Sequence, residues 1–440
     1  MTDKNDFAAL KELACALIRS RCVNDGNGNG GEERNAEVLT DFFAEAGLKA
    51  ETVYGPGNRA NLYLIGCERS GVPTYGLMGH TDVVPPGETR WSFPPFCGDI
   101  DGGYLRGRGS VDMLGQLAAM AVAVRTHMKS GGGKNVRFFA MADEETDGAC
   151  GAAWFTQTYP DLIRCDAVFS ELGGFYLNDS GVGEAAVVCA EKGVARVRLT
   201  ASGKCGHGSL PYKSDNAVSK IAASLAVVER ELSYPVLSDG YAAFVDGLPL
   251  SEDLKMRLKD TETVDAAVDE TAAVSFGLAK YLHAASRLTV MPGVIRGGTK
   301  VNVVPDEAFA DLDLRLPETM SRAELEENLN RLTPVLDGDV RWTLTEFTQG
   351  NRSPMNAAAV KEALKAARKV NPTIRFVPFV SAGVSDSRFW RRQGVPAYGF
   401  TVFASDITVD SYSRLLHGVD EKISVDSLES MYRFYRELLK

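Results

Sequence analysis

The sequence predicts an α/β fold in which a mostly parallel sheet, flanked by helices, is interrupted by a separate α+β domain. Three observations support this prediction. Short apolar runs alternate with helical patterns before Gly193, strands with alternating polarity follow it, and the first pattern resumes after Ser353. A chain of 440 residues, 45% of them hydrophobic, is too long for one ordinary domain and can form two cores.

The first expected elements are two helices near the N-terminus. Phe7 to Arg19 and Ala36 to Ala46 have helical apolar spacing, and the polar loop Asn24 to Glu33 separates them. Between Gly26 and Gly31 this loop contains the pattern GxGxxG, which binds dinucleotides when it follows a strand. Because the pattern follows a helix here, we interpret the segment as a flexible loop.

Strands and helices then alternate along the chain. Tyr75 to Met78, Val136 to Ala142 and Ala167 to Ser170 are apolar runs typical of strands, whereas Gln116 to Met128 and Ala149 to Tyr159 have helical patterns. This alternation favours a mostly parallel sheet with helices on both faces. Because ligands bind beyond the carboxyl ends of such strands, the polar residues at those ends are candidates for a functional site.

The apolar pattern changes near Gly193, where apolar and polar residues alternate along the strands. The order strand, helix, strand, strand, helix, strand predicts a ferredoxin-like antiparallel sheet with helices on one face. The expected elements are Val194 to Ala201, Asn216 to Leu232, Thr289 to Val304, Ala308 to Leu316, Ser321 to Leu332 and Val340 to Phe347. The polar, largely helical segment Pro235 to Ser286 interrupts this order as an insertion.

The last elements resume the first pattern. Asn356 to Val370 is an expected helix, Val395 to Val402 an expected strand, and Val425 to Leu439 an expected terminal helix. We therefore predict that residues 1–192 and 348–440 form one domain. Residues 193–347 would form a second domain that is inserted into the first.

The composition favours small molecules as partners. The 58 acidic and 48 basic residues give a net charge of -10, which repels nucleic acid and anionic lipid, so we expect neither nucleic acid nor membrane as a partner. The N-terminal segment lacks the basic and apolar regions of a secretory signal, and no run approaches transmembrane length. These features predict a cytoplasmic protein.

The cysteines agree with a cytoplasmic location. They are scattered without CxxC spacing, so we expect reduced thiols and no zinc-thiolate site. The eight positions are Cys15, Cys22, Cys67, Cys97, Cys150, Cys165, Cys189 and Cys205.

His80 and Asp82 follow the predicted strand Tyr75 to Met78. In an extended segment, residues two apart face the same side, so the Asp82 carboxylate can lie near the His80 ring. Such a carboxylate fixes the tautomer that offers the other ring nitrogen to a metal. A strand-end histidine beside an acidic residue, without any metal, is an equally open interpretation at this point.

Further polar residues occupy comparable positions. Asp112 follows a glycine-rich turn at the start of an apolar helix, where capping of the helix would also explain it. Glu144 and Glu145 follow the next predicted strand, Glu171 ends the strand after that, and His417 precedes the last helix. Clustered acids at the end of a buried strand are costly unless a cation neutralises them.

Together, these positions supply two histidines and three carboxylates at the strand ends of one sheet, with a further glutamate to spare. Imidazole and carboxylate are the ligands that zinc and similar metals prefer in such sites. One carboxylate that bridges two ions completes the set. The sequence therefore predicts a two-metal site.

These residues and their flanking segments resemble the aminoacylase/carboxypeptidase family of zinc metallopeptidases. This group also contains acetylornithine deacetylase and succinyl-diaminopimelate desuccinylase, and the resemblance is to its longer-lid members. It covers nearly the whole chain. The segments that carry it are HTDVVP (80–85), WxxPPF (91–96), YLRGRGSVDM (104–113), DEET (143–146), NVVP (302–305), SDSR (385–388) and HGxDE (417–421).

The resemblance implies a zinc-peptidase-like catalytic domain with two Zn²⁺ ions, for which Co²⁺ or Mn²⁺ are possible substitutes. Residues 193–347 would then be a lid domain of the kind that often dimerises, so a homodimer through the lid is an expected assembly. The implied ligands are His80 and Glu171 for one zinc ion, Glu145 and His417 for the other, and Asp112 as the bridge, with a cis peptide bond to Met113.

The resemblance also assigns roles around the metals. Glu144 would be the general base, and Asp82 would orient His80. His207, in the segment GHGSLP (206–211), would stabilise the oxyanion. Arg388 and Asn302 would bind the substrate carboxylate, since arginine pairs with carboxylates through two hydrogen bonds.

The sequence departs from the family pattern at three places. Leu114 stands where a lysine is common, and Ser170 stands where an aspartate usually precedes the glutamate. The segment Pro235 to Ser286 resembles the insertion of the longer-lid members and could replace or obstruct dimer contacts.

We therefore predict a hydrolase of amide or peptide bonds next to a free carboxylate, with an N-acyl amino acid, a dipeptide or a peptide C-terminus as the substrate. A metal-bridged water would attack the carbonyl, with Glu144 as its base. A di-zinc aminopeptidase and a non-catalytic metal-binding homologue are the alternatives. Serine hydrolysis is disfavoured, because the chain has no GxSxG segment.

Overall fold

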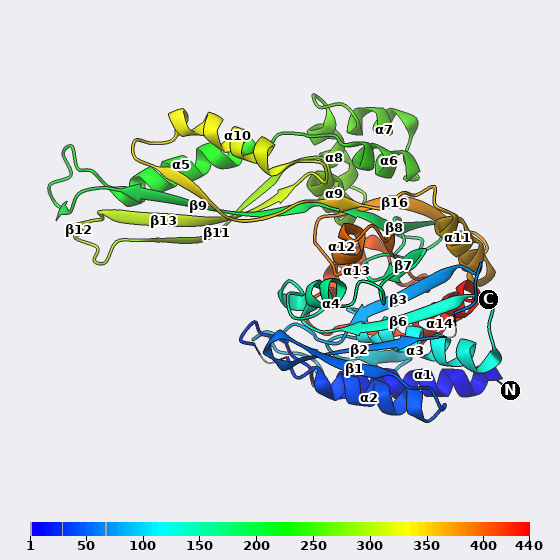
Figure 1. The fold of residues 1–440 in the computed structure, drawn as a ribbon. Helices are drawn as coiled ribbons and strands as arrows, with labels where there is room; N and C mark the ends of the chain where they lie inside the picture. The colour runs from blue at the N-terminus through cyan, green and yellow to red at the C-terminus, as the bar shows by residue number, and fades with distance from the viewer. Residues whose placement is uncertain (1, 29, 67) are drawn as a thin grey trace.

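The computed structural model describes residues 2–28, 30–66 and 68–440 (Figure 1). The chain forms a nine-stranded mixed sheet with helices on both faces and a separate four-stranded antiparallel sheet. This arrangement confirms the predicted combination of an α/β core with an α+β lid. Position 29 of the glycine-rich loop and Cys67 lie outside the described residues, so the expectations for them are not taken further.

The large sheet is parallel in its centre and again where β16 pairs with β8. The central strands β6, β3, β7 and β17 run parallel, whereas the outer pairs β1/β2, β2/β6, β17/β8 and β8/β15 are antiparallel. The sheet order is β1 (Glu51–Gly55), β2 (Arg59–Ile65), β6 (Asn135–Met141), β3 (Thr74–His80), β7 (Ala167–Ser170), β17 (Ala397–Gly399), β8 (Glu184–Glu191) and β15 (Asn351–Arg352), and β16 (Arg375–Ser381) pairs with β8 in parallel.

Side chains of the central strands alternate between two cores. Leu77 and Phe138 belong to the core under one face, and their neighbours Met78 and Phe139 belong to the core under the other. This is the period of two that a strand buried on both faces requires. The first core is covered by α1 (Thr2–Arg19), α2 (Glu33–Ala44), α3 (Leu114–Ser130), α11 (Ala358–Val370) and α14 (Val425–Leu438), and the second by α4 (Ala152–Thr158) and α12 (Ser387–Arg392).

The small sheet has the predicted ferredoxin-like order. Its strands lie in the order β11 (Thr289–Gly297), β13 (Glu307–Leu316), β9 (Gly193–Ser202) and β14 (Arg341–Thr348). The helices α5 (Ala217–Leu232) and α10 (Arg322–Leu332) share its hydrophobic core. Figure 1 shows this sheet extending away from the large one, with β12 (Val303–Val304) at its far end, where it pairs with β10 (Gly206–His207).

The inserted segment packs on the large core, although it interrupts the sequence of the small domain. Its helices are α6 (Asp239–Gly247), α7 (Glu252–Leu258), α8 (Val264–Ala272) and α9 (Phe276–Ala285). Tyr241, Phe244 and Val245 of α6 belong to the same hydrophobic cluster as the large sheet. The apolar faces of these helices are therefore buried on the side of the large sheet. The boundaries at residues 192 and 347 stay a prediction.

Smaller elements complete the fold. β4 (Asp99–Asp101), β5 (Tyr104–Arg106) and β18 (Lys422–Ser424) form a three-stranded sheet, and α13 (Val409–Leu415) precedes β18. Short 3-10 turns cover Pro56–Asn58, Glu144–Thr146 and Thr333–Val335. In the described part of the chain, no helix has both the length and the apolar content to cross a membrane. The seven described cysteines are all free thiols.

Candidate metal centre

Five predicted ligands meet where the central strands of the large sheet end. His80 is the last residue of β3, Glu171 follows β7, and Glu145 lies in the 3-10 turn after β6. Asp112 lies between β5 and α3, and His417 follows α13. Parallel strands bring their carboxyl ends to one edge, and this explains how residues far apart in sequence meet here.

Asp112 stands between the two histidines. Its Oδ1 atom lies 3.1 Å from His80 Nε2, and its Oδ2 atom lies 3.1 Å from His417 Nε2. Glu171 Oε2 is 3.2 Å from His80 Nε2, and Glu145 Oε2 is 3.2 Å from His417 Nε2. The five side chains thus form two groups of three that share Asp112, and within each group the ligand atoms lie within 4.8 Å of one another.

The charge at this centre fits divalent cations. Burial raises the pKa of Glu171 to about 8, and the neighbouring Asp112 carboxylate adds to this rise. Burial and the Glu171 carboxylate together raise the pKa of Glu144 well above its usual range. Buried carboxylates repel one another and resist ionisation unless positive charge compensates them. The mixture of imidazole and carboxylate donors suits zinc and related metals, so the residues present fit two such ions.

Asp82 contacts the His80 ring mainly through its backbone. His80 Nδ1 donates to the Asp82 carbonyl oxygen at 2.9 Å, and the Asp82 Oδ1 atom lies 3.6 Å from the same nitrogen. This arrangement leaves His80 Nε2 facing Asp112 and Glu171. The Asp82 carboxylate also accepts hydrogen bonds from the backbone N–H groups of Glu144 and Glu145, both at 3.2 Å. Asp82 therefore fixes both the ring and the adjacent acidic turn.

Glu421 holds the turn that carries Asp112, a role that the sequence did not indicate. Its Oε1 atom accepts from the backbone N–H groups of Val111 and Asp112 at 2.7 and 3.2 Å. Its Oε2 atom accepts from Arg108 Nη1 at 2.6 Å and from the Gly109 N–H at 3.1 Å. The peptide bond between Asp112 and Met113 is cis, as expected. The only sequence signal for Glu421 was its place in the segment HGxDE.

A second buried network, of hydrogen bonds and ion pairs, supports the acidic turn that follows β6. Asn24 Nδ2 donates to Asp82 Oδ2 at 2.8 Å and to Thr146 Oγ1 at 2.9 Å. Arg59 pairs with Glu32 and donates to Asp143 Oδ1 at 2.9 Å. These residues are scattered over the sequence and form no motif, so sequence analysis did not find them. Asn24 stands at the edge of the loop that was interpreted as flexible.

A cavity of about 220 Å³ opens beside this centre. Its polar side is formed by Asp112, Glu144, Glu145, Glu171 and His417. Glu144 lies in the 3-10 turn next to the ligand Glu145, so its carboxylate shares the cavity with the metal ligands. A substrate bond placed in this cavity would thus lie beside both metal positions and beside a further carboxylate.

His207 and Asn302 lie together at the far end of the small sheet. His207 pairs with Val303 in the β10/β12 bridge, and the Gly208 N–H donates to the Asn302 carbonyl oxygen at 2.8 Å. The His207 ring is exposed, and its Nδ1 atom lies 2.8 Å from Ser209 Oγ. Neither His207 nor Asn302 is among the described residues that line the metal cavity.

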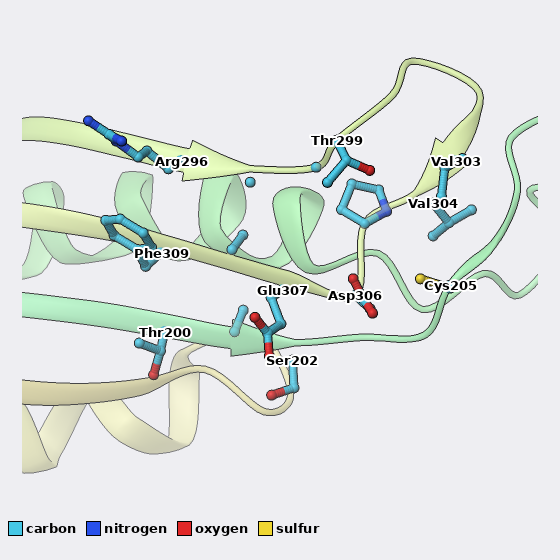
Figure 2. A pocket seen from close by; sticks show the side chains of 15 residues that line it. Thr200, Ser202, Cys205, Arg296, Thr299, Val303, Val304, Asp306, Glu307 and Phe309 are labelled. Carbon is cyan, nitrogen blue, oxygen red and sulfur yellow. The ribbon is translucent and has the colours of Figure 1, made fainter.

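The tip of the small domain has a separate hollow. Figure 2 shows this cavity, of about 490 Å³, with Arg296 and Phe309 on its sheet side and Cys205 and Asp306 near the turn. Figure 1 shows that the β12 end of the small sheet lies far from β3 and β7, whose ends carry metal ligands. The structure therefore does not bring the tip residues to the metal centre within one copy of the chain.

Arg388 lies on the catalytic side but is buried. Its Nη2 atom donates to the Asp147 carbonyl oxygen at 2.7 Å, and its guanidinium lies over the Phe389 ring. The residue is 4% exposed, and Arg388 is not among the described residues of the metal-cavity lining. In this conformation the guanidinium contacts the acidic turn rather than the cavity.

Curated relatives of this chain carry the name succinyl-diaminopimelate desuccinylase. The protein of Magnetococcus marinus is 28% identical over 380 residues, which cover 83% of this chain and 82% of the relative. The protein of a Methylobacterium species is 26% identical over 452 residues, which cover 97% of this chain and 94% of the relative.

Solved structures share the whole fold. A metallo-carboxypeptidase of the M20 family from Sulfolobus solfataricus superposes with a TM-score of 0.72 at 21% identity, covering 99% of this chain and 98% of the other. A dipeptidase from Saccharomyces cerevisiae superposes with a TM-score of 0.66 at 16% identity, covering 99% and 98%. These likenesses confirm the predicted zinc-peptidase-like fold.

The family model described as peptidase family M20/M25/M40 matches residues 76–440, which include all five candidate ligands. This match and the curated relatives confirm the resemblance inferred from the sequence and the predicted enzyme class, a hydrolase of amide bonds. The chain belongs to the peptidase family M20/M25/M40.

Proposed function

We propose that this protein is a dinuclear zinc hydrolase that cleaves an amide or peptide bond next to a free carboxylate. The substrate would be an N-acyl amino acid, a dipeptide or the C-terminus of a peptide. The observation that carries the proposal is the pair of three-residue ligand groups that share Asp112, with Glu144 in the cavity beside them.

The ligands divide between two ions. His80, Asp112 and Glu171 would hold one ion, and Asp112, Glu145 and His417 the other. When bound, a pair of zinc ions polarises a scissile carbonyl and lowers the pKa of water, and Co²⁺ or Mn²⁺ can supply similar chemistry. The protein contributes the fixed ligand positions, because Asp82 and Glu421 hold the backbone on either side of the centre.

Glu144 is the proposed general base. Its turn is held by the hydrogen bond from its N–H to Asp82, and its carboxylate lines the cavity. Burial, followed by the nearby Glu171 carboxylate, raises its pKa. Glu144 would take a proton from the attacking water and deliver it to the leaving amine.

His207 and Asn302, at the tip of the small domain, would reach the substrate only through dimerisation or domain movement. Because His207 and Asn302 lie far from the metal cavity in one copy, we propose that a homodimer, or a large movement of the small domain, brings them to the substrate. The edge strand β11 supports a dimer, since Met291 and Ile295 are 65% and 55% exposed on it. Exposed apolar edge strands favour pairing with another chain. The roles of His207 and Asn302, and that of Arg388 in binding carboxylate, stay predictions.

The proposal also covers the location. The free thiols of the described cysteines suit a reducing compartment, and this supports the predicted cytoplasmic location. Small acyl amino acids or short peptides are the proposed substrates there.

The proposed function is tested by replacing Glu144, the proposed general base, with glutamine. Glu144→Gln should retain the bound metal and lose about 10³-fold or more of kcat, whereas the exposed control Glu262→Gln should keep both. Activity would be measured on N-acyl amino acids, dipeptides and aminoacyl anilides, and metal content by elemental analysis. Near-normal turnover of Glu144→Gln would remove the base assignment. Cleavage of the anilides alone would favour an aminopeptidase, and metal binding without any turnover would favour the non-catalytic alternative.

A further inference from the structure

The apolar side of the metal cavity is built from aromatic rings. Four rings line it, and they come from four separate segments: Phe175 from the loop after β7, Tyr281 from α9, Phe379 from β16 and Tyr412 from α13. The partly exposed side chains Leu172, Val384 and Leu416 add aliphatic surface. We call these seven residues the aromatic wall. It faces the carboxylates of the metal centre across a space of about 220 Å³.

The rings of the aromatic wall hold one another in place. Phe175 stacks on Tyr412 with ring centroids 4.7 Å apart, and Tyr281 meets Phe379 at 5.0 Å with an interplanar angle of 72°. Phe175 also meets Phe379 edge to face at 5.3 Å. Offset stacking and edge-to-face contacts are the favoured geometries of aromatic pairs. The wall is therefore a packed surface rather than a set of loose side chains.

Tyr281 reaches this wall from the inserted helices. It lies on α9 one turn from Leu278, on the helix face that packs into the large core. Figure 1 shows α9 next to β16, the strand that carries Phe379. The insertion that interrupts the small domain thus contributes directly to the cavity beside the metals.

Both ends of α9 are fixed to the catalytic fold. At its N-terminal end, Asp410 accepts hydrogen bonds from Ser275 Oγ at 2.7 Å and from the Gly277 N–H at 2.6 Å. At its C-terminal end, the buried Lys192 Nζ donates to the carbonyl oxygens of Ala284 in the last turn and of Arg287 just beyond the helix, each at 2.6 Å. Free carbonyls at a helix end attract such a cation. The hydrogen bonds of Asp410 and Lys192 therefore anchor α9, the helix that carries Tyr281.

The charge of the residues that line the metal cavity determines which half of the substrate can bind there. Among the described lining residues there is no Lys or Arg, whereas three glutamates and one aspartate are present. A substrate carboxylate would therefore find no cationic side chain to pair with beside the aromatic wall. The carboxylate end of the substrate therefore lies elsewhere, and the cavity receives the other side of the scissile bond, its acyl half.

We propose that the aromatic wall, and Tyr281 within it, selects a bulky apolar acyl group. This inference rests on the proposed amide hydrolysis. Benzoyl and medium-chain aliphatic acyl groups, or an N-terminal residue with a large apolar side chain, fit this surface. A succinyl group, which is anionic at its far end, does not. The inserted helices thereby determine substrate preference, in contrast to the succinyl group in the names of the curated relatives.

The test compares N-acyl derivatives of one amino acid that differ only in the acyl group: acetyl, hexanoyl, benzoyl and succinyl. A hydrophobic pocket gains roughly 10-fold or more in kcat/KM per well-placed methylene, so hexanoyl and benzoyl should exceed succinyl by about 100-fold or more. Succinyl turnover equal to or above benzoyl turnover would overturn the preference and leave the hydrolase function intact.

Variants of α9 test the wall itself. Tyr281→Ala should lower the benzoyl-to-acetyl ratio of kcat/KM about 10-fold, Tyr281→Phe should preserve that ratio, and Tyr281→Arg should shift preference toward succinyl. Phe276→Ala is the matched control, because Phe276 is on the same helix but is 63% exposed and outside the cavity lining. An unchanged ratio in both Tyr281→Ala and Tyr281→Arg would exclude Tyr281 from selection.

A binding measurement separates this inference from the proposed function. Calorimetry with Glu144→Gln would compare the N-benzoyl and N-succinyl amino acids without turnover. Tighter binding of the benzoyl compound supports the aromatic wall even if none of the compounds is hydrolysed. Tighter binding of the succinyl compound rejects the inference whether or not the wild-type protein cleaves amides.

Discussion

At the scale of single residues, the site depends on side chains that bind the backbone around each ligand. Glu421 is the clearest case, because its two carboxylate oxygens accept three N–H groups of the Asp112 turn and one from Arg108. A glutamine has only one oxygen to accept these bonds. Its NH₂ group would face the N–H donors of the Asp112 turn or of Arg108. The position of Asp112 therefore depends on the two carboxylate oxygens of Glu421.

Glu421→Gln should weaken metal binding by about 10- to 100-fold, the usual effect of losing a group that orients a ligand. Competition of the purified variant with a chelator measures this change, and Glu262→Gln, which alters an exposed glutamate, serves as the control. Unchanged metal affinity of Glu421→Gln would mean that the Asp112 turn holds its shape without this carboxylate.

The sequence predicted the five residues that meet at this centre and Asp82 beside His80, but not the contributions of Glu421 and Asn24. His80, Glu145 and Glu171 could be predicted because a strand-end position and a metal-binding residue type coincide there. Glu421 and Asn24 could not be assigned a role, since carboxylates and amides that bind backbone or buried acids look like ordinary loop residues. His207 was predicted from a motif, but a motif does not specify which copy of the chain it serves.

At the scale of elements, buried and hairpin strands were the least predictable. The hairpin β1/β2 has few of the alternating signals that mark a strand, and β8, EAAVVCAE, is buried throughout without a helical or alternating period. Short apolar runs of this kind fit a helix or a strand equally well until the tertiary context is known. Because β1, β2 and β8 form the antiparallel part of the sheet, the sequence indicated a more parallel sheet than the structure has.

Lys192, which anchors the C-terminal end of α9, predicts how the stability of the protein depends on pH. Burial lowers the pKa of Lys192 to about 7, whereas a lysine of the unfolded chain titrates near 10.4. Between these values the unfolded state binds more protons than the folded state, so this residue makes stability rise with pH. The melting temperature of the wild type should therefore rise relative to that of Lys192→Met between about pH 7 and pH 10. If the melting temperatures of the two proteins changed in parallel over this pH range, the lowered pKa of Lys192 would be contradicted.

At the scale of the whole molecule, one chain separates its metal centre from the tip of its small domain. Met291 and Ile295 lie on the outer edge strand β11, so a lysine at both positions should disrupt pairing through that edge. We expect Met291→Lys/Ile295→Lys to shift sedimentation from dimer toward monomer and to lower kcat. Val274→Lys, which changes an even more exposed apolar residue in the insertion, should leave both unchanged. A wild type that sediments as a monomer with full activity would exclude assembly through the lid.

The molecule as a whole consists of a core that carries the metal centre, an inserted helical segment that lines one side of the cavity, and a small domain whose tip lies far from that cavity. The central claim is the pair of metal positions that share Asp112.

The most direct test is anomalous diffraction at the zinc edge from crystals of zinc-loaded, active protein. We expect two peaks, one among His80, Asp112 and Glu171 and the other among Asp112, Glu145 and His417. A single peak, peaks bound by other residues, or full activity in protein shown to be free of metal would contradict the account.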